Sequence, residues 1–153
     1  MHIHICAISK IKKKSPEEAL INEYIKKTRW PVTIKEFEEK RALTGDQLKM
    51  AESELLLASA PAGAKIIALD EGGELLSSRE LAAKISAWQD GGVADVAFLI
   101  GGANGHADSV KKRADLKLSF GRMTMPHMLA RVVLAEQIYR IKSILDGHPY
   151  HRD

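Results

Sequence analysis

The hydrophobic and polar positions of this chain alternate between segments with the two-residue period of a strand and segments with the spacing of a helix. Strands are predicted where short runs alternate or are almost wholly apolar, at residues 2–9, 32–37, 65–70, 95–100 and 116–120. Helices are predicted where apolar residues recur at helical spacing, at residues 15–28, 46–60, 77–89 and 108–114 and from Pro126 onward. This alternation predicts an α/β fold with a mainly parallel sheet and helices on both faces.

Residues typical of caps and turns support these boundaries. Ser15-Pro16-Glu17-Glu18 is typical of a helix start, and Ser77 with Glu80 forms a second capping pattern. Glu71-Gly72-Gly73 predicts a turn after the third strand. No internal repeat or long linker interrupts the order, so we expect residues 1–153 to form a single domain.

Composition limits the classes of function without choosing one. Hydrophobic residues make up 45% of the chain and charged residues 28%, which is typical of a globular protein. A net charge of +3 and a pI near 9.0 are compatible with a nucleic-acid partner but do not require one. No apolar run could cross a bilayer and residues 1–6 lack signal-peptide features, so we expect a cytoplasmic protein with no membrane partner. The single cysteine, Cys6, excludes an internal disulfide and is predicted to be buried and unreactive.

Two loops carry the indications of a ligand site. Gly101-Gly102-Ala103-Asn104-Gly105 directly follows a predicted strand, and its glycines let the backbone approach a ligand closely. Its spacing is not that of dinucleotide or triphosphate loops, and a plain strand-to-helix turn is an equally good interpretation. Residues 118–127 form an unusually apolar connection, which suits an adenine ring and a sulfonium group but also a buried crossover. Because both loops and Leu69-Asp70 follow strands, we favour one shared pocket.

The C-terminal residues His148-Pro149-Tyr150-His151-Arg152 suit nucleic acid, because their side chains can stack on a base and contact phosphates. A frayed terminus is the alternative. His148 and His151 alone do not make a zinc site, and no metal site is predicted. On the last helix, His127 and Arg131 lie one turn apart, as ordinary surface residues also do.

Basic residues follow the first predicted strand at Lys10 and Lys12–Lys14, and again at Lys40 and Arg41. Such runs are usually solvated loops, and phosphate contact is the secondary interpretation. His2 and His4 fit the first strand and are given no role.

Together these segments resemble one family over the whole chain, the ribosomal large-subunit (23S) pseudouridine N3-methyltransferases of the SPOUT superfamily. The resemblance is carried by Leu69-Asp70, Leu99-Ile100-Gly101-Gly102 with Gly105, Leu118-Ser119, Met123-Thr124-Met125-Pro126-His127, Arg131-Val132, Glu136-Gln137-Ile138-Tyr139-Arg140 and His148-Pro149-Tyr150-His151-Arg152. The C-terminal segments are far more specific than the glycine loop.

The resemblance implies a deep trefoil knot in the C-terminal half, whose loops bind S-adenosylmethionine. By position, the residues it places around this cofactor are Leu69, Asp70, Gly101, Gly102, Gly105, Gly121, Arg122, Met123, Thr124, Met125 and Pro126. It also implies a homodimer with the active site at the interface, where the candidate catalytic and nucleotide-holding residues are His127, Arg131, Tyr150, His151 and Arg152. Asn104 and His106 depart from the family pattern, and their contribution stays open.

The implied reaction is methyl transfer to N3 of a pseudouridine in the rRNA of the assembled ribosome, with no DNA partner. His127 or His151 is a candidate base, but the preferred mechanism is orientation by the tail, with Arg131 or Arg152 offsetting negative charge. The alternatives are a SPOUT enzyme acting on tRNA or another rRNA site, a non-catalytic ribosome assembly factor, and a flavodoxin-like nucleotide-binding module.

Overall fold

A computed structural model describes residues 1–153, and its centre is a five-stranded sheet in which every strand pair is parallel. The order across the sheet is β2-β1-β4-β3-β5. The strands are β1 (His2–Ile8), β2 (Val32–Phe37), β3 (Lys65–Leu75), β4 (Asp95–Ile100) and β5 (Leu116–Ser119). The predicted parallel α/β fold is therefore confirmed.

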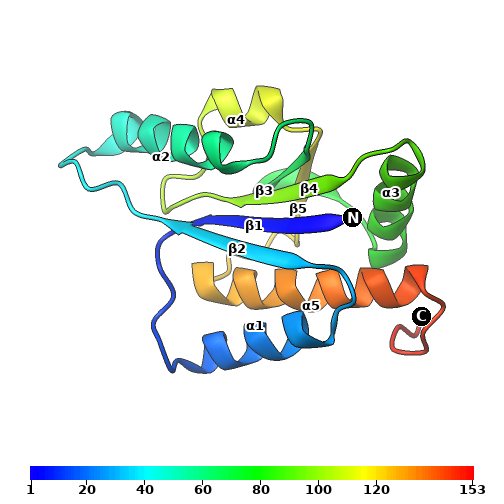
Figure 1. Cartoon of the computed structure of the whole chain (residues 1–153). Coiled ribbons are helices and arrows are strands. Elements are labelled where there is room, and N and C mark those ends of the chain that lie inside the picture. The colour runs from blue at the N-terminus through cyan, green and yellow to red at the C-terminus, as the bar shows by residue number, and fades with distance from the viewer.

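Helices cover both faces of the sheet, as the sequence predicts (Figure 1). They are α1 (Pro16–Lys27), α2 (Gly45–Ser59), α3 (Ser78–Asp90), α4 (Asp108–Arg113) and α5 (His127–Leu145). The alternating side chains of β1 explain the two layers. Ile3 and Ile5 pack in a core with α3 and α5, whereas Cys6 and Ile8 pack in a second core with α2 and α4.

The predicted caps form as expected. Ser15 Oγ accepts from the Glu18 amide at 3.2 Å, and Pro16 is the first helical residue. At the start of α3, Ser77 and Glu80 each accept from the other's backbone amide, which completes a capping box. Cys6 is fully buried, and burial raises the pKa of its thiol.

One predicted turn is wrong. Residues 71–73 lie within β3, which continues to Leu75 and pairs with β5 on both sides of a register shift between Leu69 and Glu74. Gly73 lies against β5 so closely that a Cβ there would be 2.7 Å from the Lys117 carbonyl. The two glycines therefore serve a bulge in a continuing strand instead of ending it.

The remaining boundaries differ from the predictions by one or two residues. The last helix begins at His127, with Pro126 in the preceding cap position. No helix in the structure combines the length and apolar character that crossing a bilayer requires.

Candidate active site

A cavity of about 770 Å³ lies where β3, β4 and β5 approach their carboxyl ends. Three segments contribute to its lining, which consists of residues 69–71, residues 100–106 and, after β5 begins, Leu118, Phe120, Gly121 and 123–125, together with His127 and Ala130 from the start of α5. Ser9, Lys49 and Lys111 complete the wall. The carboxyl edge of a parallel sheet is where α/β proteins bind ligands, so the predicted shared pocket is present.

The glycine loop of this pocket is a tight turn. The Gly105 amide donates to the Gly102 carbonyl at 3.0 Å, and Gly105 has a φ of +75°. A Cβ on Gly102 would lie 2.9 Å from both carboxylate oxygens of Glu52. Glu52 is buried on α2 and its Oε1 has no hydrogen-bond partner, and burial raises the pKa of its carboxyl group. The close approach of α2 therefore leaves no room for a side chain at position 102.

His106 lines the pocket although the sequence left its role open. It is buried, and its Nε2 bonds the Leu99 carbonyl at 3.2 Å. Because a carbonyl only accepts, Nε2 carries the proton and Nδ1 is the unprotonated nitrogen. Burial lowers the pKa of His106 and keeps the ring neutral. Its role is to support the glycine loop, where a Cβ on Gly101 would lie 3.3 Å from the His106 ring.

The loop after β5 forms another wall of the cavity. Its bend is held by Ser119, whose hydroxyl accepts from the Gly121 amide at 3.1 Å, and Gly121 has a φ of +134°. Gly121, Met123, Thr124 and Met125 line the pocket, whereas Arg122 and Pro126 do not. Arg122 instead donates to the Glu71 carbonyl at 3.3 Å and so bridges two walls of the cavity.

His127 lies in the cavity wall with a defined protonation state. Arg131 Nη2 donates to its Nε2 at 3.1 Å, so Nε2 is the unprotonated nitrogen. Burial, followed by the charge of Arg131, lowers the pKa of His127. The imidazole is therefore neutral near pH 7 and fixed in one tautomer.

Arg131 does not face the cavity. Its side chain is 1% exposed, pairs with Glu36 on β2 and donates to the Ser9 carbonyl at 2.9 Å. Glu36 also accepts from the Ile11 amide at 2.7 Å. Arg131 thus connects α5 to the exits of β1 and β2 and orients His127, instead of presenting its charge to a ligand in this conformation.

The C-terminal tail is ordered by contacts with α5 and α3. The Tyr150 hydroxyl donates to Glu136 at 2.9 Å, and its ring lies 4.5 Å from that of Tyr139. Arg140 donates to Nδ1 of His151 at 3.1 Å and pairs with Glu136. Burial, followed by the bond to Glu136, raises the pKa of Tyr150 to about 12. The tail is therefore not frayed.

The predicted site residues fall into two groups at opposite ends of α5. His127 lies at the pocket end, whereas Tyr150, His151 and Arg152 follow the other end, beside α3 (Figure 1). The tail turns back along α5, so the Tyr150 hydroxyl bonds Glu136, which lies nine residues or about 14 Å along the helix from His127. None of the three tail residues lines the pocket of its own chain.

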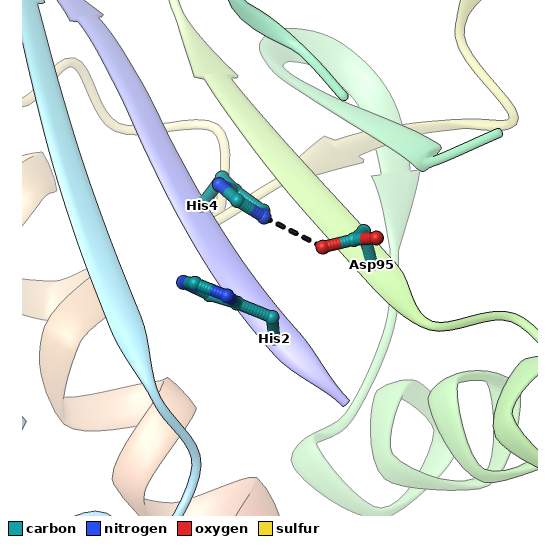
Figure 2. Close-up of side chains that lie close together, drawn as sticks. All are labelled: His2, His4 and Asp95. Carbon is teal, nitrogen blue, oxygen red and sulfur yellow. Dashed lines mark hydrogen bonds and ion pairs between the residues drawn. The ribbon is translucent and has the colours of Figure 1, made fainter. Parts of the chain in front are cut away.

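Sequence reasoning also missed a third cluster. His2, His4 and Asp95 come together at the end of the sheet opposite the pocket (Figure 2). The two-residue spacing of the histidines on a strand was an available indication of a shared face. Asp95 could not be connected to them, because it is 91 residues from His4.

An α/β fold with a pocket at the carboxyl edge of a parallel sheet defines a class of ligand-binding proteins, and comparison narrows that class. Residues 1–151 match the family described as "Predicted SPOUT methyltransferase". The chain is 55% identical to the "Ribosomal RNA large subunit methyltransferase H" of Paramagnetospirillum magneticum and 48% identical to that of Rhodospirillum centenum. Each alignment covers 99% of both chains.

A solved structure supports the fold alone. It is a probable methylase family protein from Haemophilus influenzae, with a TM-score of 0.54 and 11% identity, and the match covers 99% of this chain and 70% of that one. The chain belongs to the SPOUT methyltransferase family and is an enzyme of the methyl-transfer class. The family resemblance seen in the sequence is thereby confirmed.

Proposed function

We propose that this protein is an S-adenosylmethionine-dependent methyltransferase that modifies N3 of a pseudouridine in large-subunit (23S) rRNA. The observation that carries the proposal is the cavity built by β3 and by the loops after β4 and β5, in a chain similar over 99% of its length to large-subunit rRNA methyltransferases. The family also implies that the C-terminal half forms a trefoil knot around this cavity.

The pocket residues fit this cofactor. Its volume of about 770 Å³ lies in the range of small-molecule sites, and its apolar walls suit an adenine ring. These walls include Leu69, Ile100, Leu118 and Phe120. Asp70 adds a carboxylate that suits ribose hydroxyls or a cationic group, and the glycine loop offers backbone groups without side chains in front of them. Bound there, S-adenosylmethionine supplies an activated methyl group on its sulfonium.

The chain's own contribution is positioning. The N3–H proton of the target base must leave as the new N–CH₃ bond forms. The acceptor nitrogens of both candidate bases, His127 and His151, are already engaged by arginines. We therefore favour orientation of the base by these imidazoles, with the proton passing to solvent and Arg152 offsetting the negative charge. Arg131 acts through His127 as a positioning residue.

The tail works on a partner subunit. The tail folds back along α5, where Tyr150 bonds Glu136 and His151 bonds Arg140, and none of Tyr150, His151 and Arg152 lines the pocket of its own chain. We therefore infer that they complete a site in a second copy. Exposed apolar side chains favour such a partner, among them Leu75, Met123 and Leu129, which are 54%, 84% and 48% exposed. The proposed enzyme is a homodimer with two composite sites.

The proposed substrate is rRNA within the assembled ribosome, in the cytoplasm. A net charge of +3 supplies little general attraction for RNA, so recognition depends on a target that is already folded. Lys10 and Lys12–Lys14 are exposed, form no salt bridge and follow Ser9 at the pocket wall. They are placed to contact phosphates beside the reacting base.

The test uses purified protein, labelled S-adenosylmethionine and ribosomes from cells that lack the endogenous enzyme. Label is expected in N3-methylpseudouridine of the large-subunit RNA, identified by mass, and a naked hairpin is expected to be a poor substrate. Calorimetry measures cofactor binding separately. His151→Ala is expected to abolish most transfer while cofactor affinity is retained, and His148→Ala in the same tail is the matched control.

Other results would redirect the proposal. Label in tRNA or at another rRNA position would establish a different SPOUT specificity. Cofactor binding without transfer to any RNA would establish a non-catalytic assembly factor.

A further inference from the structure

A cluster of two histidines and one carboxylate lies at the amino ends of the inner strands β1 and β4, at the end of the sheet opposite the methyltransferase pocket. His2 and His4 alternate on β1 and so share one face of the sheet, the face that also carries Cys6. Asp95 is the first residue of β4 and the register partner of His2. Figure 2 shows the two imidazoles side by side above β1, with His4 pointing toward Asp95.

The potential ligand atoms are already close together. One ring nitrogen of each histidine and one carboxylate oxygen of Asp95 all lie within 4.8 Å of one another. His4 Nε2 is 2.8 Å from the Asp95 carboxylate, and the two imidazole rings stack with centroids 4.2 Å apart. His2 Nε2 is 2.7 Å from the Thr33 hydroxyl on β2. Three strands therefore converge on this cluster.

The hydrogen bonding of the cluster is incomplete. The side chain of His4 is only 8% exposed, and its Nδ1 is buried without a partner. Buried polar groups in folded proteins are nearly always satisfied. The unpartnered Nδ1 shows that the hydrogen bonding around His4 is incomplete, and Nε2, which faces Asp95, is the nitrogen that a metal ion would take.

We propose that His2, His4 and Asp95 form a zinc-binding site. Two imidazoles and one carboxylate are ligands that zinc accepts, whereas magnesium and calcium prefer oxygen ligands only. Three protein ligands leave the fourth tetrahedral position to water. Zinc–nitrogen distances of about 2.0–2.1 Å require tetrahedral ligands to lie about 3.3 Å apart. An imidazole binds a metal in the plane of its ring, so His2 must turn out of its stacked position against His4 to direct a nitrogen at the same ion. The His4–Asp95 pair must also open slightly, which side-chain rotation can supply because Asp95 is 27% exposed.

The site would act on stability and not on methyl transfer. It ties the start of β1 to the start of β4, at the amino ends of the strands, whereas the pocket lies toward their carboxyl ends. An ion that binds only the folded chain raises the apparent stability of that fold. The proposal does not depend on the proposed RNA substrate.

The experiment titrates zinc chloride into tag-free, chelator-treated full-length protein by calorimetry, with thermal unfolding measured in parallel. One equivalent of zinc per chain and a rise in Tm are expected. His4→Gln and Asp95→Asn are each expected to weaken zinc binding about tenfold or more and to lose the rise in Tm, and far-UV circular dichroism checks their fold. The matched control is His148→Gln, which removes an exposed histidine at a distant position.

Cobalt replaces zinc in a second measurement, because a tetrahedral site with nitrogen and oxygen ligands gives visible absorption bands. Loss of these bands in Asp95→Asn is expected. Absence of zinc binding by the wild-type protein would overturn the proposal. Binding that survives both His4→Gln and Asp95→Asn would also overturn it, since the ion would then be held by other groups such as the terminal amine.

Discussion

The two ends of α5 each carry an arginine that donates to a histidine and pairs with a glutamate, but the two arrangements are built differently. At the pocket end, Arg131 is 1% exposed and its glutamate, Glu36, lies 95 residues away on β2. At the tail end, Arg140 is 25% exposed and pairs with Glu136 one turn away on the same helix. The first arrangement joins distant parts of the fold, whereas the second is local to the helix.

This difference indicates what each end contributes. A buried pair that joins α5 to two strand exits fixes His127 relative to the sheet, and with it one wall of the pocket. The tail residues themselves make one charged contact with an element other than α5, the 2.7 Å pair between Arg79 and Asp153. The tail can therefore rearrange without disturbing the core.

Mixed dimers test the comparison with the largest expected effect. His127→Ala and His151→Ala should each lower turnover about 100-fold as homodimers, because each removes a group that orients the base. A dimer that combines one subunit of each variant should recover about half of the wild-type activity, because one of its two composite sites then has neither substitution. Activity is measured on ribosomes with differently tagged subunits purified in tandem. Mixed dimers as inactive as both homodimers would place the tail at its own pocket.

Glu36→Gln tests the buried end. The substitution leaves the Arg131 charge buried without its carboxylate, and we expect the free energy of unfolding to fall by about 3 kcal/mol. Urea denaturation measures it. The control is Glu23→Gln, because its pair with Lys27 is more than half exposed on both sides and should contribute less than about 0.5 kcal/mol. If both variants lowered the free energy of unfolding equally, the buried Arg131–Glu36 pair would contribute no more to stability than the exposed Lys27–Glu23 pair.

Tyr150→Phe tests the tail end. It removes the hydroxyl that donates to Glu136 but keeps the ring that packs on Tyr139 and under Arg140. We expect a loss of about 1 kcal/mol in tail ordering and a fall in turnover of about fivefold. Cofactor affinity, measured by calorimetry, should not change. A parallel fall in cofactor affinity would show that the tail and the pocket of one chain are coupled.

The smallest effect is on the pH dependence of stability. Burial lowers the pKa of His127 in the folded state, so the unfolded chain binds more protons below its own pKa of about 6.5. The stability supplied by neutral His127 is complete above about pH 6.5 and is lost as pH falls through the folded pKa. His127→Gln should reduce the fall in Tm between about pH 7 and pH 5, measured in thermal unfolding scans. His148→Gln is the control for removing an exposed histidine. If Tm fell with pH to the same extent in His127→Gln as in the wild-type protein, the lowered pKa of His127 would be contradicted.

Periodicity and caps were enough to predict the elements but not all of their pairing. The apolar runs at 65–70 and 95–100 and the cap at Ser77 depend on residues close in sequence, and local patterns record such interactions. The strand order depends on contacts between segments that are far apart, which no local pattern contains. The glycines at 72–73 predict a turn for the same reason, because the β5 backbone that Gly73 packs against is about 44 residues away.

The candidate site shows the same limit. The glycine loop and the loop after β5 were predicted to share a pocket, and the structure brings them together. His127 and Arg131, by contrast, have the spacing of a surface pair, and only the contact with Glu36 reveals that Arg131 is buried. His2 and His4 likewise fit an ordinary strand until Asp95 is placed beside them. The burial of Arg131 and the grouping of His2 and His4 with Asp95 each depend on one distant partner, so the sequence did not indicate them.

The continuous helix α5 has a consequence for how the length of this chain can vary. Inserting one residue between His127 and Glu136, which the tail contacts, would rotate the tail by about 100° and advance it by about 1.5 Å relative to the pocket. In the proposed homodimer, Tyr150, His151 and Arg152 would then no longer face the pocket of the second copy, although both ends of the helix would still fold. Insertions are tolerated instead in connections such as residues 38–44, which lie outside the sheet and α5. In the proposed dimer, the helix would therefore set a fixed distance between the pocket and the tail, and its residue count would matter for function.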